Sequence, residues 1–134
     1  YVTYGDKITV MWFSDAYGKI TKELRTYSDA NEVITFINTY FVTPTSGLTN
    51  FCNPFSNISQ NFADLKNIFI LSDGTFDDCG TSTADWQANL RSSVNNISAA
   101  NPGVVFTTVG VRALGTEKLE YIAQISNGVY TNWT

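Results

Sequence analysis

The sequence predicts an α/β fold in which a mainly parallel sheet carries helices on both of its faces. Two observations support this prediction. Short apolar runs alternate along the chain with segments whose apolar residues recur at helical spacing, and strands that alternate with helices usually pair in parallel. The chain has 134 residues, of which 43% are hydrophobic and 15% charged, so it can bury a core. We therefore expect a single domain over residues 1–134.

The first part of the chain predicts two strands, a helix and a loop. Residues 8–13 are a β-rich apolar run, and the more polar run 19–27 is typical of an edge strand. Residues 29–32 read Asp-Ala-Asn-Glu, the pattern of a capping box that opens a helix. The residues at helical spacing behind it are Val33, Phe36, Ile37, Tyr40 and Phe41. The stretch from residue 43 to about residue 56 is rich in Pro, Ser, Gly and Asn and predicts a loop.

The rest of the chain alternates between strands and helices. The expected strands are residues 67–71, 104–111 and 129–133. The first of them is apolar almost throughout, which is typical of a strand buried on both faces. A helical stripe is formed by Trp86, Leu90, Val94 and Ile97. Asn101 with the following Pro-Gly ends that helix, and a second helix begins after Thr116 and stops at Asn127-Gly128.

The composition disfavours several classes of function. The net charge is −4, which disfavours a nucleic-acid or anionic membrane surface because both need clustered positive charge. The sequence has no His, so Ser-His-Asp and Cys-His nucleophile pairs and His-ligated zinc are absent. No apolar run approaches the roughly 18 residues that span a bilayer, so we expect no membrane span in this chain. The glycine-rich phosphate-binding motifs are absent as well.

Three carboxylates follow the predicted strand 67–71: Asp73, Asp77 and Asp78. Such a cluster attracts a hard cation such as Mg²⁺ or Ca²⁺, and the same residues also suit a solvated turn. A phosphatase of the haloacid-dehalogenase type would need a nucleophilic Asp where Leu71 stands, and Leu cannot attack a phosphoryl group. We expect no enzyme activity. A metal-assisted hydrolase that uses the three Asp residues is the alternative.

The cysteines and the glycosylation sequons bear on the compartment. Cys52 and Cys79 are too few for a disulfide scaffold, and their spacing alone allows either one structural disulfide or two unrelated buried thiols. Asn-X-Ser/Thr sequons stand at Asn57, Asn96 and Asn132. With 13 Asn and 28 Ser plus Thr in the chain, chance alone yields about three sequons, so they permit secretion without demonstrating it.

Several short motifs then occur in a particular order. They are Phe-Ser at the end of residues 8–14, Ser-Gly-Leu-Thr-Asn at 46–50, Ile-Phe-Ile-Leu-Ser-Asp-Gly at 68–74, Phe-Thr-Thr-Val-Gly-Val at 106–111, Glu-Lys-Leu-Glu-Tyr-Ile-Ala at 117–123 and Gly-Val-Tyr at 128–130. In this order the chain resembles the von Willebrand factor type A domain. The motifs are similar to that family's second strand, Gly-Gly-Thr-Asn loop, strand ending in Ser-Asp-Gly, Ile-Gly-Val-Gly strand, and closing helix and strand.

The resemblance implies a three-layer α/β/α, Rossmann-like fold. It also implies that the domain is incomplete at its amino end, because the family's first strand and first helix are missing. The Asp-X-Ser-X-Ser motif is missing as well, and this motif supplies the main ligands of the family's metal site. Thr49 and Asp73 match two further metal-site positions of the family. Bound Mg²⁺ or Ca²⁺ is therefore expected to have only a partial ligand set in this chain.

The resemblance further implies an extracellular adhesion or protein-binding module. In its metal-dependent form, an acidic residue of a protein partner completes the coordination of the cation. The resemblance places Cys52 and Cys79 in loops at one edge of the sheet, which favours a disulfide between them and a secreted protein. A degenerate, metal-free domain of the same type is the alternative within the family.

Overall fold

The computed structural model describes residues 5–14, 16–40, 49–112 and 115–133. Phe41, the predicted loop up to residue 48, and Thr134 of the last sequon lie outside the described residues. The elements are β1 (Lys7–Phe13), β2 (Tyr17–Glu23), α1 (Tyr27–Tyr40), α2 (Cys52–Asn61), β3 (Asn67–Ser72), α3 (Thr83–Ala100), β4 (Val105–Val111), α4 (Glu117–Ser126) and β5 (Val129–Trp133). The predicted α/β class is confirmed.

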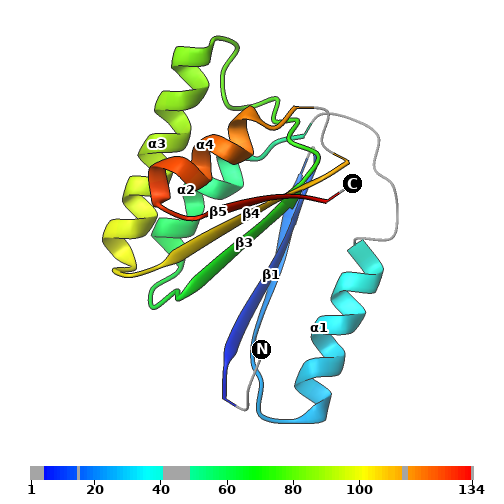
Figure 1. Ribbon diagram of the computed structural model, residues 1–134. Helices are drawn as coiled ribbons and strands as arrows, with labels where there is room; N and C mark the ends of the chain where they lie inside the picture. Colours follow the sequence, from blue (N-terminus) through cyan, green and yellow to red (C-terminus); the bar gives the residue numbers. More distant parts are fainter. Residues whose placement is uncertain (1–4, 15, 41–48, 113–114, 134) are drawn as a thin grey trace. The chain divides into compact units, whose positions relative to one another are not determined.

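The chain divides into two compact units, Tyr1–Leu48 and Thr49–Thr134. In the first unit, β1 and β2 form an antiparallel hairpin against which α1 packs (Figure 1). The hairpin register places Trp12 opposite Gly18, where any side chain at residue 18 would meet the indole ring. The ring of Trp12 also stacks on Tyr40 of α1, with 5.4 Å between ring centroids. The aromatic contact therefore joins the strand end to the helix end within this unit.

Helix α1 begins earlier than the sequence pattern predicts. The capping box was expected over residues 29–32, but the helix starts at Tyr27 and its capping residue is Thr26. The Asp29 N–H donates to Thr26 Oγ1 (3.2 Å), and the Thr26 N–H donates to Asp29 Oδ2 (2.9 Å). This reciprocal pair is the geometry of a capping box, with Asp29 as the third helical residue and not, as predicted, as the N-cap. Both registers satisfy the local pattern, and the helix adopts the one that Thr26 caps.

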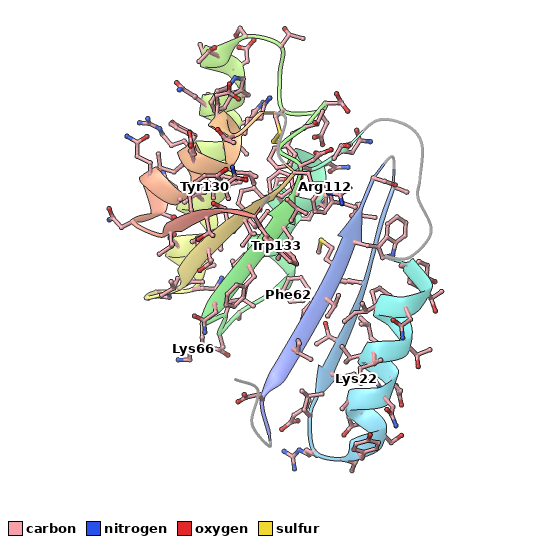
Figure 2. All side chains as sticks on the ribbon, turned by 45° about the vertical axis from the view of Figure 1, so that its right-hand side comes forward. Lys22, Phe62, Lys66, Arg112, Tyr130 and Trp133 are labelled. Carbon is pink, nitrogen blue, oxygen red and sulfur yellow. A yellow bond between two sulfur atoms is a disulfide. The ribbon has the colours of Figure 1, made fainter. Side chains whose placement is uncertain are left out.

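The second unit is built on a parallel sheet with strand order β3-β4-β5. Helices α2, α3 and α4 all lie on one face of this sheet (Figure 1). Figure 2 labels Lys66 just before β3 and Arg112 just after β4, which mark the amino and carboxyl edges of the sheet. The core lies between the sheet and these helices, and its fully buried side chains include Phe55, Leu90, Ile97, Phe106, Leu119 and Ile122. The predicted helical stripe of α3 is thus confirmed as core.

Strand β3 differs from its prediction. A strand buried on both faces was expected, yet Phe69 is 66% and Leu71 55% exposed, whereas Ile70 between them is 6% exposed. The strand therefore alternates, as a strand covered on one face does. The reason is that within the described residues of this unit the helices cover one side only. The expected helices on both faces stay a prediction.

Asn101 explains why α3 ends where the sequence predicts. This side chain is only 2% exposed, and its Oδ1 accepts the Leu65 N–H at 2.8 Å. Its Nδ2 donates to the Ile97 carbonyl at 3.0 Å. A buried amide needs such partners. Asn101 therefore fixes the end of α3 against the segment that enters β3.

Candidate functional site

The candidate site lies at the carboxyl edge of the parallel sheet, where two segments distant in sequence meet. One is the segment that enters α2, and the other is the loop that follows β3. The Thr49 N–H donates to Asp77 Oδ2 at 2.6 Å, and the Asp77 N–H donates to the Thr49 carbonyl at 2.8 Å. The expectation that these loops share one edge of the sheet is therefore confirmed.

Asp78 caps helix α2 from outside the helix. Its Oδ1 accepts the N–H groups of Phe51 and Cys52, each at 2.8 Å, and its Oδ2 accepts that of Asn53 at 2.8 Å. The N-cap residue Phe51 has no side chain that could do this. The first N–H groups of a helix lack partners within the helix, and negative charge is favoured at that end. A carboxylate from 25 to 27 residues away thus satisfies the start of α2.

This capping explains where the predicted loop was wrong. The loop was expected to extend to about residue 56, but α2 begins at Cys52. Pro54 lies in its first turn, where a missing N–H costs no helical hydrogen bond. A cap that arrives from Asp78 leaves no local signal. The capping role of Asp78 therefore has no signal in the sequence around Cys52.

A disulfide joins the same two segments. Cys52 and Cys79 are bonded, with their Cα atoms 5.2 Å apart. The pairing implied by the family resemblance is confirmed, and the alternative of two free thiols is wrong. Cys79 is fully buried and Asn89 Nδ2 donates to its carbonyl at 2.6 Å. The loop after β3 is thereby fastened both to α2 and to α3.

Asp73 has a different environment from the other two carboxylates. It is exposed, and its Oδ1 accepts the Thr75 N–H at 2.9 Å in a local turn. The following Gly74 has φ +87°, and a Cβ there would overlap the carbonyl oxygen of Gly115. The turn that presents Asp73 is therefore tightly packed against the next loop of the same edge.

The three carboxylates therefore differ in how available they are to bind a ligand. Asp77 and Asp78 accept main-chain N–H groups that hold the two segments together, whereas Asp73 stands at the end of β3 and faces solvent. Thr49 and Asp73 offer oxygen ligands, which suit Mg²⁺ or Ca²⁺, but they form only part of a shell. Among the described residues, the Cys, Asp and Glu side chains close enough to share an ion are Cys52, Asp78 and Cys79. Their sulfurs are bonded to each other, so this group supplies no thiolate.

The three sequons lie at the surface in different settings. Asn57 on α2 is half-buried, and its Nδ2 donates to Asn53 Oδ1 at 3.5 Å. Asn96 on α3 and Asn132 on β5 are exposed. Glycosylation at all three stays a prediction.

No protein-family model matches this chain, and no curated protein matches it by sequence. Among the described residues, no helix is both long enough and apolar enough to cross a bilayer.

Proposed function

We propose that the chain is part of an extracellular protein-binding module of the von Willebrand factor type A kind. The order of elements in the second unit supports this: three parallel strands alternate with helices, and the loops at their carboxyl ends gather on one edge. In open α/β sheets that edge is where ligands bind. The antiparallel β1–β2 hairpin is also compatible with the resemblance, which places Ile8–Ser14 in the family's second strand.

The observation that carries the proposal is the two-way hydrogen bonding between Thr49 and Asp77. It fixes the segment of Thr49 against the loop that begins at Asp73. In the proposed mechanism, Thr49 and Asp73 would supply oxygen ligands to Mg²⁺ or Ca²⁺, and water would complete most of the remaining shell. When bound, the cation offers a coordination position to an acidic residue of a protein partner. The hydrogen bonds between Thr49 and Asp77 and the Cys52–Cys79 disulfide hold the two segments in place.

The disulfide supports an oxidising compartment, because such bonds persist outside the reducing cytosol. We therefore propose that the protein is secreted. The Cys52–Cys79 bond joins the same two segments that carry Thr49 and Asp73. A rigid edge of this kind would lower the cost of ordering when a partner binds.

A titration with Mg²⁺ tests the metal-dependent form. The melting temperature should rise with Mg²⁺ concentration, since an ion that binds only the folded chain stabilises the folded state. Asp73→Asn keeps a side-chain oxygen for the Thr75 N–H but removes the charge, so the turn should survive and the rise should disappear. Glu120→Gln removes one exposed charge on α4 and is the matched control.

A metal-free domain of the same type is the second candidate. It is favoured by the use of Asp77 and Asp78 in structural hydrogen bonds, which leaves few ligands at the edge. An equal melting temperature with and without Mg²⁺ would select it. The hydrolase alternative would have to act through Asp73 alone, and hydrolysis of a phosphate ester that Asp73→Asn abolishes would revive it.

A further inference from the structure

The two halves of the Cys52–Cys79 disulfide differ in their access to solvent. Cys52 is 8% exposed, and Cys79 is 0% exposed. Cys52 also lines a shallow hollow of about 340 Å³, whose walls come from the first turn of α2, the middle of α3 and Asp78. A small thiol that approaches the bond from this hollow meets Cys52 first (the disulfide is the yellow sulfur–sulfur bond in Figure 2).

Attack at Cys52 produces an unfavourable leaving group. When a thiolate attacks Cys52 Sγ, the electron pair of the broken bond stays on Cys79 Sγ. That sulfur lies 3.7 Å from Asp78 Oδ1, so a negative charge would develop beside an existing carboxylate. Like charges at this separation repel strongly in a partly buried place, where water screens them poorly. The Asp78 carboxylate also lies within 4.8 Å of the Cys52 sulfur, so it repels an anionic thiolate that approaches Cys52. The rate of attack at Cys52 should therefore be low, and lowest for an anionic thiol.

The opposite direction of attack has no access. Attack on Cys79 Sγ would leave the charge on Cys52, the first residue of α2, and a helix N-terminus favours negative charge. Cys79 is enclosed, however, and its main chain is tied to Asn89 of α3. Burial closes the one route, and Asp78 opposes the other.

We propose that Asp78 protects the Cys52–Cys79 disulfide against thiol exchange, and that exchange enters through Cys52 from the hollow. In the first step a thiolate bonds to Cys52 Sγ, the sulfur–sulfur bond breaks, and Cys79 Sγ takes a proton from water. In the second step another thiolate attacks the sulfur of the bound thiol. The new bond joins the two small-molecule sulfurs in a disulfide, and Cys52 leaves as a thiolate that takes a proton from water. The two electrons come from the two thiols. Asp78 takes no part in bonding and acts through its charge and its position.

The first test compares thiols of different charge on the folded 134-residue chain at neutral pH. Cysteamine is cationic, 2-mercaptoethanol neutral and mercaptoacetate anionic, and each rate is divided by its rate on the same chain in urea. Asp78→Asn keeps one oxygen for the Phe51 and Cys52 N–H groups, removes the charge and gives up the acceptor of the Asn53 N–H. Exchange with the neutral thiol should accelerate about tenfold or more, and the preference for the cationic thiol should fall. Asp77→Asn, which changes the net charge equally, should alter both by less than about twofold.

Two outcomes of this comparison would overturn the proposal. One is an unchanged exchange rate in Asp78→Asn. The other is an acceleration with an unchanged ratio of cationic to anionic thiol rates, because a merely structural loss of the cap would expose the bond to all thiols alike.

The second test needs no variant and holds even if Asp78→Asn fails to fold. Wild-type chain is exposed to 2-mercaptoethanol, quenched with acid at early times and mapped by mass spectrometry. The mixed disulfide should be found on Cys52. A mixed disulfide that forms first on Cys79 contradicts the proposed direction of attack.

Discussion

The Asp78 carboxylate accepts the main-chain N–H of Cys52 at 2.8 Å, across 26 residues of sequence. The same carboxylate also accepts the N–H groups of Phe51 and Asn53, so one side chain satisfies three donors at the start of α2. The residue after Asp78 is bonded to Cys52 through sulfur. A hydrogen-bonded cap and a covalent bond therefore reinforce each other at one helix end.

Loss of this cap should cost more than loss of an ordinary local one. Asp78→Ala leaves three N–H groups without their acceptor and should lower the free energy of unfolding of the second unit by about 2–3 kcal/mol. Ser82→Ala at α3 removes the acceptor of a single N–H, that of Asp85, and should cost about 1 kcal/mol. Urea unfolding, followed by hydrogen–deuterium exchange of peptides from the second unit, measures both. Equal losses of unfolding free energy in the two variants would show that the cap on α2 stabilises no more than an ordinary local cap.

Gly74 should tolerate substitution far less than Gly103. Both have positive φ, +87° and +82°, so alanine is strained at either position. At Gly103 an added Cβ meets nothing within 4 Å, and Gly103→Ala should cost about 1 kcal/mol. At Gly74 the Cβ would overlap the Gly115 carbonyl, so Gly74→Ala should cost about 3 kcal/mol or more. Urea midpoints of the two variants test the difference, and a cost at Gly74 no greater than at Gly103 would mean that the loop around Gly115 yields.

The disulfide should contribute a few kcal/mol through its effect on the unfolded chain. It spans 27 residues, for which loop-closure entropy corresponds to about 3–4 kcal/mol. The double variant Cys52→Ala/Cys79→Ala should therefore unfold at lower urea concentration than the oxidised wild type. The main-chain hydrogen bonds to Asp77 and Asp78 should keep the variant folded at low temperature. If the variant is as stable as the oxidised chain, the cap alone holds the two segments.

The stability of the first unit should depend on the ionisation of Asp29. Hydrogen bonds from the N–H groups of Arg25 and Thr26 and from the Thr26 hydroxyl lower the pKa of Asp29 below its ordinary value of 3.8. A lowered folded-state pKa means that the stabilisation is complete above the unfolded-state pKa. It is lost as pH falls from that value through the folded-state pKa.

An NMR titration of the Asp29 carboxyl carbon measures this shift directly. The midpoint should lie below 3.8 in the wild type, and Thr26→Ala should move it part of the way back because one of the three donors is lost. Protection of α1 amides should fall over the same range of pH. A midpoint at or above 3.8 would contradict the capping geometry.

Features with local causes could be predicted along the chain. The core stripe of α3 and its end at Asn101 follow from spacing and from a stop signal, and the left-handed Asn127 ends α4 where its sequence indicates. The alternation of strands and helices likewise predicted the α/β class. In each case the residues that determine the structure are close together in the sequence, so the sequence pattern predicts it.

Features with distant causes could not be read in this way. Helix α2 starts inside a predicted loop. Its capping carboxylate comes from Asp78, and no residue near Cys52 in the sequence indicates this partner. The apolar run of β3 predicts burial on both faces, since composition does not reveal which neighbours are present to cover Phe69 and Leu71. The candidate site shows the same division. Asp73 and Thr49 were named from motifs, whereas the roles of Asp77 and Asp78 appeared only with their partners.

Local sequence patterns predict the class of fold, the position of most helices and strands, the acidic loop after β3 and two cysteines that could pair. Contacts in space establish that the cysteines are joined, that main-chain N–H groups engage two of the three acids, and that Asp73 faces solvent. The physical reason is the range of the interactions. Periodicity and turn chemistry act over a few residues, whereas a carboxylate that caps a helix or a sulfur that bonds another is selected by proximity in space.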